Sequence, residues 1–148
     1  MEVLVLPSIY FSKGQMNKKN KYHSSKVTYD GFVFDSRLEG ARYLYLRNLE
    51  RQGVIQNLQM QVEYEILPRQ SKQIIKHLKT KDKIVEKPLE RPVKYKCDFQ
   101  YMYNGELVVE DVKGSSFAMS RDFPIRKKLM LYMHGIEVRV IKEASQKI

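Results

Sequence analysis

The sequence predicts a mixed α/β (α+β) fold, in which a central mixed sheet is flanked by helices. Runs of strand length that are apolar or alternate in hydrophobicity occur at 59–67, 93–103, 106–113 and 136–141. Two segments with helical spacing, 36–53 and 122–134, are interspersed with these runs. The order of elements is therefore helix, strand, hairpin, helix, strand, which is typical of a sheet covered by helices. A chain of 148 residues is long enough for one such domain.

Both predicted helices have recognisable ends. Ser36 is a suitable N-cap for the first helix, and Glu39 three residues later completes a capping box. Gly53 follows the last turn of this helix, as expected for a C-terminal stop. In the second helix Pro124 falls in the first turn, where proline is tolerated, and Gly135 is the stop.

The segment between the first helix and the hairpin has two parts. Residues 59–67 alternate between apolar and polar side chains, as in a half-buried strand. Residues 68–92 are rich in lysine and bounded by prolines, so we expect an exposed insertion with a short helix around 74–78. The resulting organisation is an N-terminal segment with a basic arm at 1–28 and a single domain at 29–148.

The dipeptide Asn104–Gly105 predicts a two-residue hairpin turn, because a type I′ turn needs a positive φ angle at both central positions. With these two residues at the centre, Tyr103 faces Glu106. Counting outward from that pair makes Asp98 and Asp111 cross-strand partners on one face. Their Cβ atoms would then lie about 5 Å apart.

Side chains alternate along a strand, so Lys113 shares the face of Asp111, whereas Glu110 points to the opposite face. Both faces of the hairpin also carry apolar residues, which indicates that helices cover both sides. Two like charges opposite each other in a covered sheet are unfavourable unless one is protonated or a cation binds. Two carboxylates at this separation can hold one Mg²⁺. The alternative is a salt-bridge cluster at the surface, in which Lys113 neutralises Asp111 while Asp98 faces solvent.

The chain is strongly basic, with 27 Lys+Arg against 17 Asp+Glu and a net charge of +10. This excess favours a polyanionic partner, with nucleic acid ahead of an anionic membrane surface. No run approaches transmembrane length, and we expect no membrane partner. The candidates for binding DNA phosphates lie in a basic arm at 12–26 and around the second helix: Lys18, Lys19, Lys21, Lys26, Arg121, Arg126 and Lys127. The same charges would also suit a tail without a partner and a solvated helix face.

The single cysteine, Cys97, excludes an internal disulfide and a cysteine-rich zinc site. The N-terminal stretch MEVLVLPSIYF is too short for a signal peptide or a membrane span, and Pro7 interrupts it. We therefore expect the protein in a reducing cytoplasm.

Several motifs resemble those of known nucleases. Two aspartates on a hairpin, the second followed by x-Lys, with a glutamate on a preceding helix, resemble the PD-(D/E)XK nuclease superfamily. The element order is similar to the restriction-endonuclease-like αβββαβ core of that superfamily. The stretches KYHSSKVTYDGFVFDSRLEGARYLYL (21–46), YKCDFQY (95–101) and VVEDVKG (108–114) further resemble a phage-borne family, formerly of unknown function, that is grouped with Holliday-junction-resolvase-like nucleases.

This resemblance implies a role for each residue that matches the motif. Asp98 and Asp111 would be metal ligands, and the backbone carbonyl of Val112 could be a third. Lys113 would be the catalytic lysine. Glu39 would be the helix-borne acid that completes the site, although the capping box alone would also explain it.

The sequence departs from the family pattern at two positions. Gln61 matches a glutamine that the family often places before proline, but Val62 follows it here. We expect Gln61 to contact the metal ligands without binding the metal ion itself. Cys97 stands before Asp98 where the superfamily often has proline. Glu110 is the second choice for the second carboxylate, disfavoured because alternation turns it away from Asp98.

The expected function is that of a Mg²⁺-dependent DNA endonuclease acting on duplex, branched or otherwise structured DNA, with Mn²⁺ as a substitute cation. Phage recombination, replication or packaging would then be its setting, and the bacterial host cytoplasm its location. A homodimer would suit the two symmetric cuts that a junction requires. The alternative is a non-catalytic basic DNA-binding module or regulator on the same fold, and a role with protein partners alone fits the charge less well.

Overall fold

A computed structural model of the chain describes residues 25–114 and 120–148. The protein has a mixed α/β fold, as predicted, and no helix in these two ranges is long and apolar enough to cross a membrane. The elements in chain order are β1 (Val27–Tyr29), β2 (Phe32–Phe34), α1 (Arg37–Arg51), β3 (Gln56–Met60), β4 (Glu63–Leu67), β5 (Gln70–His77), β6 (Asp82–Glu90), β7 (Val93–Lys96), β8 (Phe99–Tyr103), β9 (Glu106–Val112), α2 (Phe123–His134) and β10 (Val138–Ile141).

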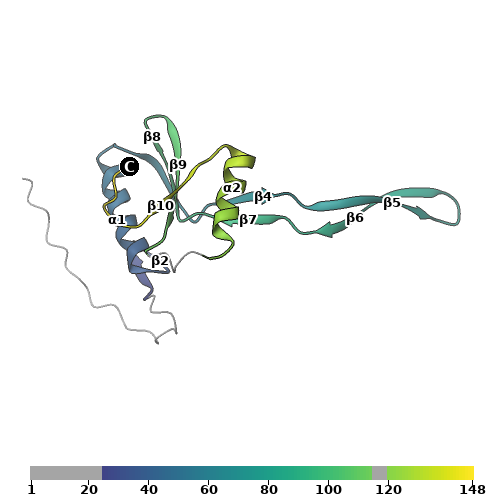
Figure 1. Ribbon diagram of the computed structural model, residues 1–148, viewed down its shortest axis with the longest axis horizontal. Coiled ribbons are helices and arrows are strands. Elements are labelled where there is room, and N and C mark those ends of the chain that lie inside the picture. The colour runs from purple at the N-terminus through teal and green to yellow at the C-terminus, as the bar shows by residue number, and fades with distance from the viewer. Residues whose placement is uncertain (1–24, 115–119) are drawn as a thin grey trace, which may run out of the picture.

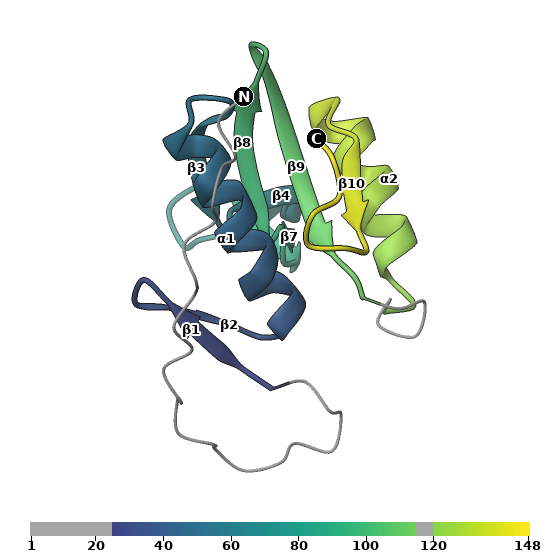
Figure 2. The ribbon, with the colours of Figure 1, turned by 90° about the vertical axis from the view of Figure 1, so that its left-hand side faces the viewer.

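A four-stranded mixed sheet with the order β10-β9-β8-β3 lies at the centre of the fold. Strand β10 runs parallel to β9, whereas β8 is antiparallel to both of its neighbours, β9 and β3. The parallel pair needs a crossover connection, and α2 supplies it. Figure 2 shows α1 on one side of these strands and α2 on the other.

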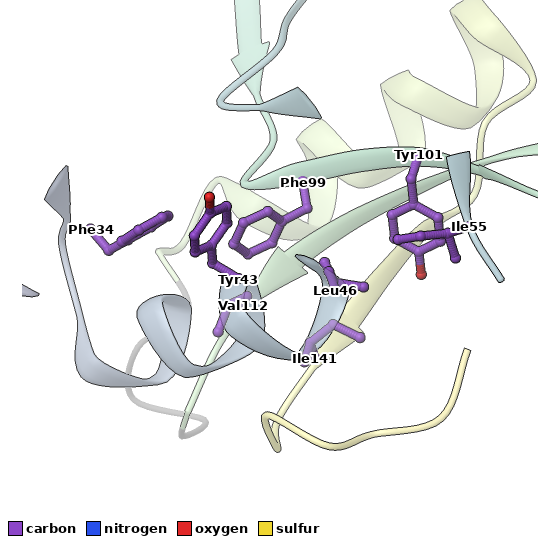
Figure 3. Close-up of a cluster of buried hydrophobic side chains, with 8 residues drawn as sticks. All are labelled: Phe34, Tyr43, Leu46, Ile55, Phe99, Tyr101, Val112 and Ile141. Carbon is purple, nitrogen blue, oxygen red and sulfur yellow. The ribbon is translucent and has the colours of Figure 1, made fainter. Parts of the chain in front are cut away.

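Apolar clusters fill both faces of this sheet. The cluster on the α1 side, drawn in Figure 3, consists of Phe34, Tyr43, Leu46, Ile55, Phe99, Tyr101, Val112 and Ile141. The cluster on the α2 side consists of Ile66, Tyr95, Cys97, Val109, Phe123, Met130 and Val138. Strand β9 contributes to both, with Val112 on the first side and Val109 on the second. The expectation that helices cover both faces is therefore confirmed.

The ends of the two helices follow the signals in the sequence. Ser36 caps α1, since its Oγ accepts a hydrogen bond of 3.1 Å from the backbone N–H of Glu39. Gly53 lies just beyond this helix with a φ angle of +74°. Pro124 occupies the first turn of α2, and Gly135 ends it in the left-handed conformation with φ +67°.

The short hairpin β1–β2 packs against the beginning of α1. A Cβ atom at Gly40 would lie only 2.5 Å from Cγ2 of Val27, so this close approach requires glycine. Val27 and Tyr29 also contact the core cluster on the α1 side. The folded region therefore starts before residue 29, where the sequence placed the domain boundary.

Residues 56–103 form one long antiparallel hairpin in three successive parts. Strand β3 pairs with β8, β4 pairs with β7, and β5 pairs with β6 at the far end. The last pair stands away from the body of the protein as a ribbon, as Figure 1 shows. The insertion predicted at 68–92 is thus exposed, but the helix expected around 74–78 is wrong. Those residues lie in or just beyond β5, because Ile74 and Ile75 pair across the ribbon with Val85 and Ile84.

Both long strands of this hairpin are interrupted at the same level. Gln61 adopts a left-handed conformation, with φ +54°, between β3 and β4. The facing strand bends at Cys97 and Asp98, between β7 and β8. Two backbone hydrogen bonds join the bends, from Gln61 N–H to the Asp98 carbonyl at 2.9 Å and from Cys97 N–H to the Val62 carbonyl at 3.0 Å. The predicted continuous strands 59–67 and 93–103 are therefore each divided in two, and Asp98 lies at the break.

Candidate active site

The turn at Asn104–Gly105 sets the register of the site. Both residues have positive φ angles, +49° and +80°, as the type I′ turn requires. Strands β8 and β9 pair from Tyr103 with Glu106 through to Phe99 with Glu110. The predicted register is thus confirmed over these five pairs. Asp98 precedes Phe99 at the bend, and the hydrogen bond from the Val112 N–H to its Oδ2 places it beside the part of β9 that contains Asp111.

Asp111 is held inside the protein near the end of β9. Its side chain is buried, with 4% of the residue surface exposed. Oδ2 accepts a hydrogen bond of 2.7 Å from the Tyr95 hydroxyl. Oδ1 is also buried, and within residues 25–114 and 120–148 its partner is the ammonium group of Lys113, whose Nζ lies 2.6 Å from it. One carboxylate oxygen is thus fixed by the protein, while the other has only a charge contact.

Asp98 is tied to the same strand. Its Oδ2 accepts a hydrogen bond of 2.7 Å from the backbone N–H of Val112. Its own N–H donates to the Glu110 carbonyl at 3.1 Å. Burial raises the pKa of Asp98 to about 7, against the effect of the Val112 hydrogen bond, and the charges of Asp111 and Glu39 raise it further. The pair thus cannot hold two negative charges at neutral pH without a cost in free energy.

Lys113 connects the acidic pair to the second helix. Its side chain is 23% exposed, and Nζ lies 5.4 Å from the centre of the Phe123 ring on α2. Its backbone N–H donates to the Ile141 carbonyl at 2.8 Å, which anchors it to β10. The ammonium group is therefore held beside Asp111 and still reaches solvent.

The Glu39 side chain bonds back to the start of α1 and also acts on the acidic pair. Oε1 accepts a hydrogen bond of 3.2 Å from the Ser36 hydroxyl, and Oε2 accepts one of 3.2 Å from the Asp35 N–H. Burial raises the pKa of Glu39, while the positive charge of Lys113 lowers it. Because Glu39 is coupled by charge to both Lys113 and Asp98, it combines the helix cap with a position close to the pair.

Glu110 is turned away from the acidic pair, as strand alternation predicts. It is fully buried on the α1 side, where its two carboxylate oxygens accept bonds of 2.9 and 2.6 Å from Arg42. The Tyr101 hydroxyl donates to the same carboxylate at 2.6 Å. Arg42 in turn donates to the carbonyls of Ala144 and Gln146 at 3.0 and 2.5 Å. This network links α1 to β9 and to the C-terminal segment. Arg42, Glu110 and Tyr101 all form hydrogen bonds within it.

A divalent cation fits the donors present at the pair. In the two ranges that the structure covers, no group of three or more His, Cys, Asp or Glu side chains is arranged to hold a metal ion. The donors here are the carboxylates of Asp98 and Asp111, which can be completed by backbone oxygens such as that of Val112. Two features favour a cation: the buried Oδ1 of Asp111, which already attracts the Lys113 ammonium group at 2.6 Å, and the raised pKa of Asp98.

The remaining predicted site residues are dispersed. The Gln61 side chain accepts a bond of 3.3 Å from Nζ of Lys96, and it touches the site only through its backbone bond to Asp98. Lys26 is paired with Asp35 at 3.3 Å. Arg126 is paired with Asp122 at 2.7 Å. Arg121 is exposed before α2 and Lys127 is half-buried on it, while Lys18, Lys19 and Lys21 lie outside the described residues.

Tyr95 is the site residue that the sequence reasoning missed. Alternation counted back from Phe99 and Tyr101 places Tyr95 on the α1 side, away from Asp111. The bend at 97–98 interrupts the alternation of side chains, so Tyr95 belongs to the cluster on the α2 side. Its hydroxyl there donates a hydrogen bond to Asp111. A bend before an aspartate leaves no clear signal in a single sequence.

Comparison with protein-family models finds a match that covers residues 19–145. No curated protein and no solved structure matches the chain. The matching model is described as a protein of unknown function (DUF1064), and the matched residues include every group of the candidate active site. The chain belongs to this family of proteins of unknown function, DUF1064.

Proposed function

We propose that the protein is a metal-dependent endonuclease that hydrolyses phosphodiester bonds in DNA. The observation that carries the proposal is the juxtaposition of Asp98, Asp111 and Lys113 at the end of the β8–β9 hairpin. Packing of the core does not require two carboxylates opposite each other at this place. The motifs that resemble the PD-(D/E)XK nucleases, and among them the Holliday-junction-resolvase-like phage family, give the same assignment.

The two aspartates and the Val112 carbonyl would hold Mg²⁺, or Mn²⁺ in its place. When bound, such an ion polarises the phosphodiester and lowers the pKa of a coordinated water molecule. Tyr95 would keep the Asp111 carboxylate in one orientation through its hydrogen bond. Lys113 would orient the attacking water and offset the negative charge that develops on the phosphate. Water would attack in line, leaving a 5′-phosphate and a 3′-hydroxyl.

The charge of the chain supports DNA as the substrate class. A net charge of +10 attracts a polyanion, and no membrane-spanning helix is found in the part of the chain that the structure covers. The proposed setting is the cytoplasm of a bacterial host, with duplex or branched DNA as substrate. A homodimer is part of the proposal only for a four-way junction, where two symmetric cuts are needed.

One observation favours a second candidate function, that of a non-catalytic DNA-binding module. Lys113 already lies 2.6 Å from Asp111 Oδ1, so the site can offset part of its negative charge without a metal ion. In that case the basic surface would bind DNA and the acidic pair would take no part in turnover.

The test uses labelled duplex, single-stranded, flap and four-way-junction DNA with Mg²⁺, Mn²⁺ or EDTA. The wild type is compared with Asp111→Asn and with the control Glu106→Gln, which removes an exposed carboxylate at the turn end of the same strand. We expect metal-dependent cleavage that Asp111→Asn abolishes and Glu106→Gln retains. Tight binding with no cleavage of any substrate would instead support the DNA-binding module.

A further inference from the structure

The ribbon β5–β6 separates its charges between its two faces. In the observed register Lys72 lies opposite Lys87 and Lys76 lies opposite Lys83, with the pair Ile74 and Val85 between them. Because side chains alternate along each strand, these six residues share one face, which we call the lysine face. It contains no acidic residue. Its four lysines are exposed, while Ile74 and Val85 are half-buried.

Two of the three acidic residues that pair across the ribbon, Asp82 and Glu86, belong to its opposite face, while Glu90 pairs with Gln70 beyond the register shift at the base of the ribbon. On the opposite face Glu86 accepts a hydrogen bond from the Ser71 hydroxyl, and Asp82 is 2.7 Å from Nδ1 of His77. Ile75 and Ile84 form an exposed apolar pair on the same side, with 60% and 67% of their surfaces open. The acids of this face are therefore engaged with polar groups there and are not placed to neutralise the lysines.

The lysine face is unfavourable for the ribbon by itself. Like charges directly opposite each other in paired strands are destabilising. In the described part of the chain, none of these four lysines forms a salt bridge, whereas Lys26, Lys94 and Lys113 each do. An isolated two-stranded ribbon is at best marginally stable in water. Among the strands that the structure describes, β5 and β6 pair only with each other, and they extend away from the core (Figure 1). A bound polyanion would remove the repulsion and fix the ribbon.

We propose that the lysine face binds the phosphate backbone of duplex DNA and acts as a clamp outside the cleavage site. The two lysine pairs are four residues apart, or about 13 Å along the ribbon. This spacing is close to the width of the DNA major groove, about 12 Å, into which a two-stranded ribbon fits. A ribbon that crosses the groove would place one lysine pair near each bordering phosphate chain. The choice of DNA as the polyanion rests on the proposed function.

The length of the chain between them limits how far the lysine face can lie from the proposed site of cleavage. Lys87 is eleven residues before Asp98, so at about 3.3 Å per residue the lysine face begins at most about 36 Å from the acidic pair. That distance is close to one helical turn of DNA, about 34–36 Å. One duplex could therefore contact both the acidic pair and the ribbon.

Charge argues against the other occupants of this face. A second copy of the chain that docked through the same face would bring eight lysines together. The exposed pair Ile75 and Ile84 is the part of the ribbon that would suit a second copy, and it lies on the opposite face. The charge of the lysine face thus favours a polyanion over a second copy of the chain as its partner.

The test is the salt dependence of duplex binding by the full chain in EDTA, so that no cleavage occurs. Fluorescence anisotropy with a labelled duplex of about 30 bp, close to three helical turns, gives the dissociation constant at several salt concentrations. Lys76→Gln/Lys83→Gln removes one facing pair. The control Arg51→Gln/Lys147→Gln removes two exposed charges elsewhere: Arg51 is the last residue of α1, about 18 Å along the helix from Glu39.

We expect the magnitude of the log–log salt slope to fall by about 2 in the lysine variant, at about 0.9 per lost phosphate contact. The affinity difference from wild type should accordingly shrink about tenfold between roughly 50 and 200 mM salt. The control should keep the wild-type slope, and far-UV circular dichroism should show that both variants are folded.

Three results would overturn the clamp. The first is an unchanged slope in the lysine variant, and the second is an equal fall in both variants, which would indicate general charge attraction. The third is a dimer in light scattering that Ile75→Thr/Ile84→Thr dissociates while the lysine variant binds DNA normally. Failure of the clamp remains distinct from failure of the nuclease, because the slope is measured without cleavage and Asp111→Asn tests cleavage separately.

Discussion

Replacing Asp98 by asparagine should stabilise the protein at neutral and alkaline pH. The pKa of Asp98 is raised from about 3.8 to about 7, chiefly because the carboxyl group is buried. The folded state therefore binds a proton between these two values that the unfolded state has released, and stability falls as the pH rises through this window. This difference between the pKa values of the folded and unfolded states corresponds to about 4 kcal/mol at pH 8. Asparagine retains an oxygen to accept the Val112 hydrogen bond and carries no charge.

The assay is urea denaturation of wild type and Asp98→Asn from pH 5 to pH 8, followed by circular dichroism in EDTA. Other titrating groups are common to both proteins, so the difference in free energy of unfolding reports Asp98 together with its coupling to Asp111 and Glu39. This difference should grow by about 3 kcal/mol in favour of the variant over that range. Glu106→Gln, with an exposed side chain at the turn, should follow the wild type. If the difference in free energy of unfolding between the two proteins did not change with pH, the claim that the site disfavours the ionised form of Asp98 would be refuted.

Three further predictions concern the groups that support the site. Tyr95→Phe removes the hydroxyl that donates a hydrogen bond to the buried Asp111 carboxylate. It should lower the free energy of unfolding by about 1–3 kcal/mol and slow cleavage. If neither quantity changed, the role given to this hydroxyl would be contradicted. Arg42→Ala leaves Glu110 buried without its partner and should cost about 3–5 kcal/mol in urea denaturation. Gly40→Ala places a Cβ atom 2.5 Å from a side-chain carbon of β1. It should lower the melting temperature, because overpacking costs about 1–3 kcal/mol. A higher melting temperature would show that β1 can move to accommodate the added methyl group without cost.

The sequence predicts the acidic pair because the determinants of its register are local. The Asn104–Gly105 turn admits one arrangement of φ angles, and strand alternation then assigns each residue of β9 to a face. The same reasoning separates Asp111 from Glu110, and the structure gives these neighbours different partners, Lys113 and Arg42. The helix ends are equally local, since caps depend on a few residues around each terminus.

Other features depend on contacts between distant segments and could not be predicted in this way. The bends at Gln61 and Asp98 hold each other through backbone bonds, and neither has a proline or glycine to signal it. For this reason strand alternation alone does not bring Tyr95 to Asp111. The helix expected at 74–78 failed because pairing with β6 outweighs the local pattern, and that partner lies several residues beyond a lysine-rich turn.

The central claim is that Asp98 and Asp111 together form a site for one divalent cation. The most direct measurement is titration of the protein with Mn²⁺, in which electron paramagnetic resonance reports the free ion. We predict one Mn²⁺ per chain for the wild type and for Glu106→Gln, and none for Asp98→Asn or Asp111→Asn. Absence of binding to the wild type, or the same stoichiometry in Asp111→Asn, would contradict the claim.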